Sequence, residues 1–230
     1  MFKNAAVVSL DLDDTLWDVG NVIRRAETEV GRWLAGNAPA MAEYLRDAGV
    51  TALRADIVAQ HPDKAHDFGF VRRAIYLQAA AATGQSSATA DAAFAEFHRW
   101  RNTVDLFGDV AAALAALAAS YDLIAVTNGT ADLALVGIDE HFVDSVTAAR
   151  AGAAKPHPQI FELAAELIGQ PPERFVHVGD DPHLDVDGAR QVGMQTVWVN
   201  RPGVDWPADL APPDVAVADL AELAEVMGAG

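Results

Sequence analysis

The chain has 230 residues, and 51% of them are hydrophobic, which is enough for a core in one large domain or in a domain with a smaller insertion. Its 16 basic and 33 acidic residues give a formal net charge of −17, which argues against nonspecific binding to nucleic acid or to anionic membranes. There are no cysteines, so disulfides and thiolate metal sites are excluded.

The N-terminus has no basic segment followed by an apolar one, and no apolar run is long enough to cross a bilayer. We therefore expect a soluble cytoplasmic protein with no membrane partner and no nucleic-acid partner.

The first predicted strand runs from about Phe2 to Asp11 and ends in alternating carboxylates. Because side chains alternate between the faces of a strand, Asp11 and Asp13 are expected to share one face near its tip. Carboxylates this close raise each other's pKa unless a cation or a proton intervenes. The pattern therefore indicates Mg²⁺ or an acid/base pair, with a solvated turn as the ordinary alternative.

The segment from about Gly20 to Trp100 has helical spacing and no convincing strand. Its apolar faces are Ile23-Ala26-Val30-Leu34, Val71-Ala74-Ile75-Gln78 and Phe94-Phe97-Trp100. This insertion leaves the sheet just after Asp13 and returns near Asp105, so it should cover the carboxyl ends of the strands, where open α/β sheets bind ligands. We interpret it as a cap, with hinges near 17–20 and 103–108.

Further strands are predicted at Leu123 to Thr127, Phe175 to Gly179 and Thr196 to Val199. Helices are predicted at Val110 to Ser120 and at Gln159 to Ile168, the latter after Pro158 and before Gly169 as its stop. The alternation of strands and helices predicts an α/β fold with a Rossmann-like parallel sheet and an inserted, all-helical domain. We place the core at 1–18 and 105–230 and the cap at 19–104.

Two polar clusters follow the middle of this pattern. Thr127-Asn128-Gly129 ends the second strand with a hydroxyl, an amide and a flexible turn that can bind phosphate oxygens, although such a triplet is also an ordinary turn. Lys155 precedes Pro156, which stiffens the backbone and holds one cation in a defined place.

The last cluster resembles the first, because the strand at Val176 to Gly179 ends in Asp180, Asp181 and then Asp185. Asp180 could bind a metal directly while Asp185 binds the metal's water ligands, as Mg²⁺ keeps part of its hydration shell. Asp181 is explained by N-capping of the next helix.

Other polar and aromatic residues are expected to be structural. The seven histidines lack the spacing of a zinc site. Trp17 is expected to pack between core and cap or to line the entrance. We expect most of the cap arginines to be solvated: Arg24, Arg25, Arg72, Arg73, Arg99 and Arg101.

Taken in order, Asp11-Leu12-Asp13-Asp14-Thr15, Thr127-Asn128-Gly129, Lys155-Pro156 and Gly179-Asp180-Asp181 with Asp185 resemble the four motifs of the haloacid dehalogenase-like (HAD) superfamily. The resemblance covers essentially the whole chain, and the insertion resembles the C1-type cap of subfamily I.

The resemblance implies a phosphatase that forms an aspartyl-phosphate, with Asp11 as nucleophile and Asp13 as general acid/base. It implies Mg²⁺ bound by the carboxylates of Asp11 and Asp180 and by the backbone carbonyl of Asp13. The remaining roles it implies are for Thr127, the Asn128 backbone N–H and Lys155, which would hold the phosphoryl oxygens.

Trp17-Asp18, Ile23-Arg24-Arg25, Trp100-Arg101 and Val176-His177-Val178-Gly179 are similar to bacterial 5-amino-6-(5-phospho-D-ribitylamino)uracil phosphatases of riboflavin synthesis. That group implies a small phosphorylated metabolite as substrate, with FMN and sugar phosphates as further candidates. Neither the physiological substrate nor the oligomeric state follows from the sequence.

Three alternatives remain open or are disfavoured. A phosphomutase of the same superfamily needs a cap that keeps water out, which sequence does not report. A non-catalytic phosphate-binding protein would be expected to lack Asp11, Asp13 or Lys155, and all three are present. A receiver-type signalling domain is disfavoured by the chain length and by a cap after the first strand.

Overall fold

The computed structural model describes residue 2 and residues 4–229. The chain divides into two compact units. Unit 1 contains Met1–Asp18, Asp105–Gly129 and Val136–Gly230, and unit 2 contains Val19–Val104 and Thr130–Leu135. Residues 130–135, which we assigned to the core, thus group with unit 2. Positions 1, 3 and 230 of the predicted domains, and position 3 of the first predicted strand, lie outside the described residues.

Unit 1 is built on a six-stranded parallel sheet with the strand order β3-β2-β1-β4-β5-β6. The strands are β1 (Val7–Leu10), β2 (Asp122–Thr127), β3 (Asp144–Thr147), β4 (Phe175–Gly179), β5 (Gln195–Val199) and β6 (Val215–Val217). Every residue of β1 and β4 is buried, as expected for central strands covered on both faces. The α/β prediction with a Rossmann-like parallel sheet is confirmed.

The four predicted strands are present, and sequence analysis missed the two edge strands. β3 reads Asp-Ser-Val-Thr and has one buried residue, while β6 is three residues long, so neither has the apolar run by which buried strands are recognised. The first strand begins at Val7, later than predicted, and it ends at Leu10.

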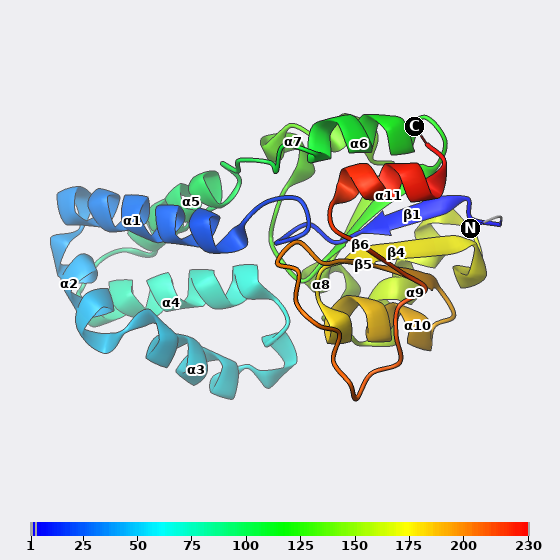
Figure 1. The fold of residues 1–230 in the computed structure, drawn as a ribbon. Coiled ribbons are helices and arrows are strands. Elements are labelled where there is room, and N and C mark those ends of the chain that lie inside the picture. The colour runs from blue at the N-terminus through cyan, green and yellow to red at the C-terminus, as the bar shows by residue number, and fades with distance from the viewer. Residues whose placement is uncertain (1, 3, 230) are drawn as a thin grey trace. The chain divides into compact units, whose positions relative to one another are not determined.

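Helices cover both faces of this sheet (Figure 1). One face carries α6 (Val110–Ala118) and α11 (Leu220–Met227), which pack on each other. The other face carries α8 (Ala148–Ala151), α9 (Pro158–Ile168) and α10 (Gly188–Gln191). A π-helical turn, Pro182–Asp187, leads from β4 into α10.

The ends of α9 follow the local rules on which its prediction depended. The His157 side chain accepts a hydrogen bond from the Gln159 backbone, and Pro158 occupies the first turn. Gly169 ends the helix in the left-handed conformation with a φ of 71°, which a residue with a Cβ adopts only with strain. The predicted helix and its stop are confirmed, with the start one residue earlier.

Unit 2 is helical throughout its described residues. It contains α1 (Val19–Asn37), α2 (Pro39–Ala48), α3 (Val50–Gln60), α4 (Phe68–Ala82), α5 (Ser87–Arg101) and most of the short α7 (Leu133–Val136). Its core is formed by residues repeating at helical spacing, such as Val30 and Leu34 of α1, Val71 and Ile75 of α4, and Phe97 of α5. The helical prediction for this segment is confirmed, while its action as a cap stays a prediction.

The cap arginines are less solvated than expected. Arg101 is buried, and Arg72 pairs with Glu27 at 2.6 Å while its guanidinium lies 4.2 Å from the centre of the Phe97 ring. The long arginine stem can cover apolar surface while its head keeps a polar partner, so a helical position alone did not predict exposure. Of the same set, Arg24, Arg73 and Arg99 are exposed.

Among the described residues, the structure contains no helix long and apolar enough to span a membrane.

Leu34→Ala should destabilise the protein by about 2–5 kcal/mol, because it leaves a cavity in the buried core of unit 2. Leu135→Ala provides the matched control, since Leu135 is 58% exposed and its truncation should change stability by about 0.5 kcal/mol or less. Chemical denaturation followed by circular dichroism would measure both. Equal losses for the two variants would contradict the assignment of this core.

Candidate active site

The polar residues picked out by sequence meet at the carboxyl edge of the three central strands. Asp11 follows β1, Thr127 ends β2 and Asp180 follows β4, and these strands are neighbours in the sheet. The carboxyl edge of an open α/β sheet is the usual ligand-binding edge.

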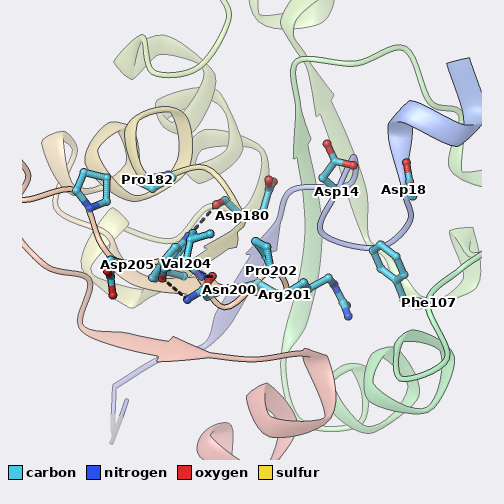
Figure 2. Close-up of a pocket in the computed structure, with 13 residues that line it drawn as sticks. Asp14, Asp18, Phe107, Asp180, Pro182, Asn200, Arg201, Pro202, Val204 and Asp205 are labelled. Carbon is cyan, nitrogen blue, oxygen red and sulfur yellow. Dashed lines mark hydrogen bonds between the residues drawn. The ribbon is translucent and has the colours of Figure 1, made fainter.

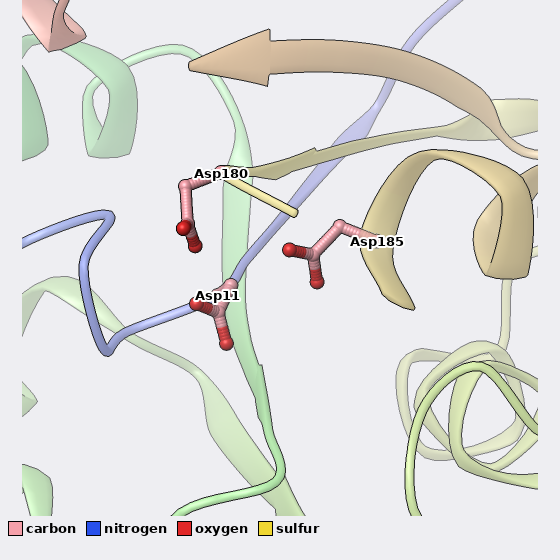
Figure 3. A group of neighbouring side chains, drawn as sticks. All are labelled: Asp11, Asp180 and Asp185. Atoms are coloured by element: carbon pink, nitrogen blue, oxygen red, sulfur yellow. The ribbon is translucent and has the colours of Figure 1, made fainter. Parts of the chain in front are cut away.

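Three carboxylates converge at this edge (Figure 3). Oxygens of Asp11, Asp180 and Asp185 all lie within 4.8 Å of one another. Carboxylate oxygens are the donors that hard divalent cations prefer. The donor set therefore fits a cation such as Mg²⁺.

Lys155 supplies the positive charge of the cluster. Its Nζ lies 2.5 Å from Asp11 Oδ1 and 2.6 Å from Asp185 Oδ1. The three side chains are 3%, 8% and 2% exposed, respectively, so solvent screens these ion pairs little. The cluster thus combines three carboxylates with one ammonium, and its net negative charge can accept a further positive charge.

Burial and pairing compete in setting the pKa values of this cluster. Burial is the largest influence on Asp11 and raises its pKa well above the ordinary value, although the Lys155 charge opposes it. Burial would also raise the pKa of Asp185, but the Lys155 charge and the His177 hydrogen bond outweigh it and hold that pKa below the ordinary value. Lys155 has a raised pKa despite its burial, because two carboxylates face it, and so it stays charged.

Asp180 lies in surroundings that disfavour its ionised form. Burial and then the neighbouring charges of Asp185 and Asp14 raise its pKa to about 7. A bound cation would offset this repulsion and favour the ionised form. The crowding of Asp180 is thus a second indication that the edge is built for a positive ion.

The backbone of Lys155 is fixed by the side chain of Asn128. Lys155 N donates to Asn128 Oδ1 at 2.7 Å, and Asn128 Nδ2 donates to the Lys155 carbonyl at 3.1 Å. The peptide bond between Lys155 and Pro156 is cis. Sequence analysis gave a role only to the Asn128 backbone N–H, so this structural use of its side chain was missed.

Thr127 keeps its hydroxyl proton available for a ligand. Its Oγ1 accepts a hydrogen bond from Gly129 N at 2.9 Å, and a hydroxyl that accepts can still donate. The residue is buried at the end of β2.

Asp13 has a different environment from Asp11. Strand alternation does not apply to this pair, because β1 ends at Leu10, before both residues, and the expectation that they share one face stays a prediction. Asp14 takes a left-handed conformation with a φ of 58°, and its N–H donates to the Trp17 carbonyl at 2.8 Å. The Asp13 carboxylate accepts from Trp17 Nε1 at 2.8 Å and is not part of the three-carboxylate cluster.

Trp17 thus has a polar role that sequence analysis missed. Its side chain is fully buried, and its indole N–H orients the Asp13 carboxylate from the same tight turn. The spacing of four residues between Asp13 and Trp17 was the feature of the sequence that could have indicated this hydrogen bond.

Asp181 behaves as predicted. It caps the π-helical turn by accepting from the His183 and Leu184 backbones, each at 2.8 Å. Its own N–H donates to Asp185 Oδ2 at 3.0 Å and so helps to aim Asp185 at Lys155.

His177 extends the buried network in a way that sequence spacing did not indicate. It pairs with Ser9 across β4 and β1, with its Nδ1 2.9 Å from Ser9 Oγ and its Nε2 3.3 Å from Asp185 Oδ1. Burial lowers the pKa of His177, so the ring is neutral and has one N–H. The arrangement that satisfies all three groups has Ser9 donating to Nδ1 and Nε2–H donating to Asp185.

Thr15 joins two carboxylates of the cluster. Its Oγ1 lies 3.3 Å from Asp11 Oδ2 and 3.3 Å from Asp180 Oδ1, and the residue is fully buried. Asp180 is also held through its backbone, because Trp198 Nε1 of β5 donates to the Asp180 carbonyl at 2.8 Å.

A cavity of 640 Å³ within unit 1 reaches this cluster (Figure 2). Asp14 and Asp180 line it together with Phe107, Trp198 and Arg201. Its mixture of carboxylates and apolar side chains can accommodate a small polar molecule next to Asp180.

With this geometry in view, comparison with known proteins identifies the family. The model of the haloacid dehalogenase-like hydrolases matches residues 5–193. The chain belongs to the haloacid dehalogenase-like hydrolase family. The predicted membership of the HAD superfamily is thus confirmed, while the roles of the residues in the four clusters stay predictions.

Individual relatives differ in their named activities. The chain is 32% identical over 231 residues to the 5-amino-6-(5-phospho-D-ribitylamino)uracil phosphatase YigB of Escherichia coli (strain K12), an alignment that covers 96% of each protein. It is 36% identical to a phosphoserine phosphatase of Thermus thermophilus over 133 residues, which is 55% of this chain and 53% of that one.

Among solved structures, a 2-haloacid dehalogenase from Pseudomonas syringae pv. Tomato DC3000 is similar to the chain with a TM-score of 0.89. The two are 32% identical, and the match covers 97% of this chain and 98% of that one. A HAD phosphatase from Thermococcus onnurineus is similar with a TM-score of 0.66 and 25% identity, covering 98% of both chains.

Gly179→Ala should displace Asp185, because an added Cβ would lie 2.2 Å from the Asp185 side chain. We expect a loss of stability of about 1–3 kcal/mol from this overpacking, measurable by chemical denaturation. Gly31→Ala is the control, since nothing lies within 4 Å of its added Cβ in α1, and it should stabilise the protein by about 0.5–1 kcal/mol. A neutral Gly179→Ala variant would contradict the close packing of Asp185.

Asp180→Asn should stabilise the metal-free protein increasingly between pH 4 and pH 8. The folded-state pKa of about 7 exceeds the ordinary value of about 3.9, so the folded state binds more protons in this range and stability falls as pH rises. The asparagine variant does not titrate and escapes that loss. Near pH 8 its Tm should therefore exceed that of the native protein, by roughly 2–4 °C for each ~1 kcal/mol of stability difference. Thermal unfolding in chelator would measure it, and a pH-independent difference would contradict the raised pKa.

Proposed function

We propose that the chain is a Mg²⁺-dependent phosphatase that hydrolyses a small phosphorylated metabolite through an aspartyl-phosphate on Asp11. The observation that carries the proposal is the buried Asp11 carboxylate, which lies 2.5 Å from the Lys155 ammonium and within a cluster of further carboxylates. Burial raises the pKa of Asp11, and the Lys155 charge opposes that shift. A bound cation would add to the effect of Lys155 and favour the ionised, nucleophilic form of Asp11.

Asp11 and Asp180 would hold Mg²⁺ through their carboxylates and Asp13 through its backbone carbonyl, with Asp185 binding the outer shell. When bound, the cation would screen the charge of Asp11 from that of the phosphate. Burial and the neighbouring negative charges, which together raise the pKa of Asp180 to about 7, support this assignment.

The first step would be attack of an Asp11 oxygen on phosphorus, in line with the bond to the departing oxygen. The P–O bond of the ester breaks, and Asp13 gives its proton to the departing oxygen, so an alcohol leaves. In the second step Asp13 takes a proton from water, and the water oxygen displaces Asp11 from phosphorus. The products are the alcohol and inorganic phosphate, and both side chains are restored.

The groups that would hold the phosphoryl oxygens are oriented before substrate binds. The Lys155 ammonium has three N–H donors, of which Asp11 and Asp185 occupy two. Thr127 retains its hydroxyl proton, and the Asn128 side chain fixes the Lys155 backbone. Donors placed in advance stabilise the charge of the transition state without reorganising during reaction.

The relatives support a phosphate ester as substrate, and one solved structure favours a second candidate function. YigB and the phosphoserine phosphatase are named for phosphate esters, whereas the Pseudomonas syringae protein is named a 2-haloacid dehalogenase. A departing halide needs no proton, while a departing alkoxide does. The Asp13 side chain, oriented by Trp17, would supply this proton from its protonated carboxyl group, which favours the phosphatase.

On the substrate, we propose 5-amino-6-(5-phospho-D-ribitylamino)uracil first, and hence a place in riboflavin synthesis. The near full-length similarity to YigB supports it. FMN and sugar phosphates are the next candidates.

Phosphate release with Mg²⁺ should be compared across that uracil derivative, FMN, sugar phosphates and phosphoserine, with halide release from 2-chloropropionate in parallel. We expect phosphate release and a higher kcat/KM for the uracil derivative. Halide release without phosphate release would overturn the proposal in favour of the dehalogenase. Transfer of phosphate between positions of one sugar would favour a mutase.

Asp11→Asn should lower kcat by about 10³-fold or more, because the amide is not a nucleophile. Circular dichroism and thermal unfolding would check that the variant folds. Glu166→Gln, on the exposed face of α9, is the control and should keep full activity. A folded Asp11→Asn variant with native turnover would exclude the aspartyl-phosphate.

A further inference from the structure

Arg201, in the loop after β5, makes contacts that the chemistry proposed above does not use. Its Nε and Nη2 donate to the Thr15 carbonyl at 3.1 and 2.9 Å. Its Nη1 and Nη2 donate to the two Asp109 oxygens at 3.0 and 2.8 Å. The guanidinium carbon lies 4.1 Å from the centre of the Phe107 ring. One planar guanidinium therefore holds the first motif and the segment 107–109 together within unit 1. Figure 2 shows Arg201 beside Phe107.

Thr15 connects this arginine to the candidate catalytic carboxylates. Its carbonyl is held by Arg201, and its hydroxyl lies 3.3 Å from both Asp11 Oδ2 and Asp180 Oδ1. The Thr15 side chain is stiff because it is β-branched, and it is fully buried. Fixing its backbone therefore fixes where the hydroxyl lies between the two carboxylates.

The partner of Arg201 is itself anchored. Asp109 Oδ2 accepts from the Leu220 backbone at 2.8 Å, at the start of α11. Its carboxylate is only 15% exposed and the Arg201 side chain 18%, so the bidentate pair is largely protected from water. The planar fork of arginine can serve a carboxylate and a carbonyl at once, which the single point charge of lysine cannot reproduce.

Two further contacts hold the segment that contains Thr15. Phe107 N donates to the Leu16 carbonyl at 3.0 Å, next to Thr15, and Trp17 pairs with Leu106 in an isolated bridge. The segments 15–17 and 106–109 are thus paired with each other. Along the chain, the first lies just before the residues of unit 2 and the second just after them. Arg201 contacts both segments from a third part of the sequence.

We propose that Arg201 is a positioning residue that sets the Thr15 hydroxyl between Asp11 and Asp180 and thereby the geometry of the cation-binding carboxylates. This inference rests on the proposed function. It assigns to the loop after β5 a role in phosphoryl transfer that acts through Thr15.

The test compares Arg201→Gln, Arg201→Lys, Thr15→Val and the double variant Arg201→Gln/Thr15→Val. Mg²⁺ binding to each protein would be measured by titration calorimetry without substrate, and kcat and KM with p-nitrophenyl phosphate. Arg190→Gln is the matched control, since Arg190 of α10 donates to the Ala211 and Pro212 carbonyls, further along the loop that contains Arg201, and contacts none of the site carboxylates discussed above.

We expect Arg201→Gln and Thr15→Val each to weaken Mg²⁺ binding and to lower kcat by roughly 10–100-fold, with KM nearly unchanged. Arg201→Lys should recover only part of the loss. The double variant should be no worse than the poorer single variant, because both act through the same hydroxyl. Arg190→Gln should match the native protein in both measurements.

Additive losses in the double variant, or native Mg²⁺ affinity and kcat in folded Arg201→Gln, would overturn the inference. If Arg201→Gln does not fold, Arg201→Lys is compared with Thr15→Val instead. Native Mg²⁺ affinity in Arg201→Lys together with weakened affinity in Thr15→Val would likewise overturn the inference.

A native protein that binds Mg²⁺ but hydrolyses no ester contradicts the proposed function, and the Mg²⁺ titrations then still decide the role of Arg201. Absence of Mg²⁺ binding by the native protein contradicts both.

Discussion

Lys155 places one positive charge between Asp11 and Asp185 at a point where all three side chains are withdrawn from solvent. Two carboxylates buried this close would otherwise repel each other and take up protons. Because removing one partner of such a buried pair costs about 3–5 kcal/mol, the ammonium is a condition for this edge of the fold as well as for its chemistry. The structure accordingly fixes Lys155 from both ends, through its ammonium and through Asn128.

The elements around this charge act mainly to hold oxygens in place. Asp185 is aimed by the Asp181 N–H and by His177, which Ser9 orients across two paired strands. Gly179 is required because a Cβ there would occupy the space of the Asp185 side chain. A site of this kind depends on close packing behind the reacting groups, since a small displacement of a carboxylate changes both its charge and its reach.

The Asp180 side of the site is supported by contacts that do not involve Lys155. Trp198 of β5 holds the Asp180 backbone, and Arg201 in the following loop holds Thr15. The strand β5 and its loop therefore contribute to the site although they supply none of the carboxylates. The residues of the site therefore come from β2, β1, β4 and β5, which are neighbours in the sheet although they do not follow one another in this order along the chain.

The sequence by itself determined the parallel sheet, the helical insertion and the residues of the four motifs, because apolar periodicity and residue type are local properties of the chain. It also determined that Asp181 would cap a helix. Only the tertiary structure decided that Asp13 turns to Trp17 and that Ser9, His177 and Arg201 support the site. These contacts join residues up to 186 positions apart or depend on a turn with a positive φ, and the pairing of distant side chains is set by strand register and packing, which no local pattern encodes.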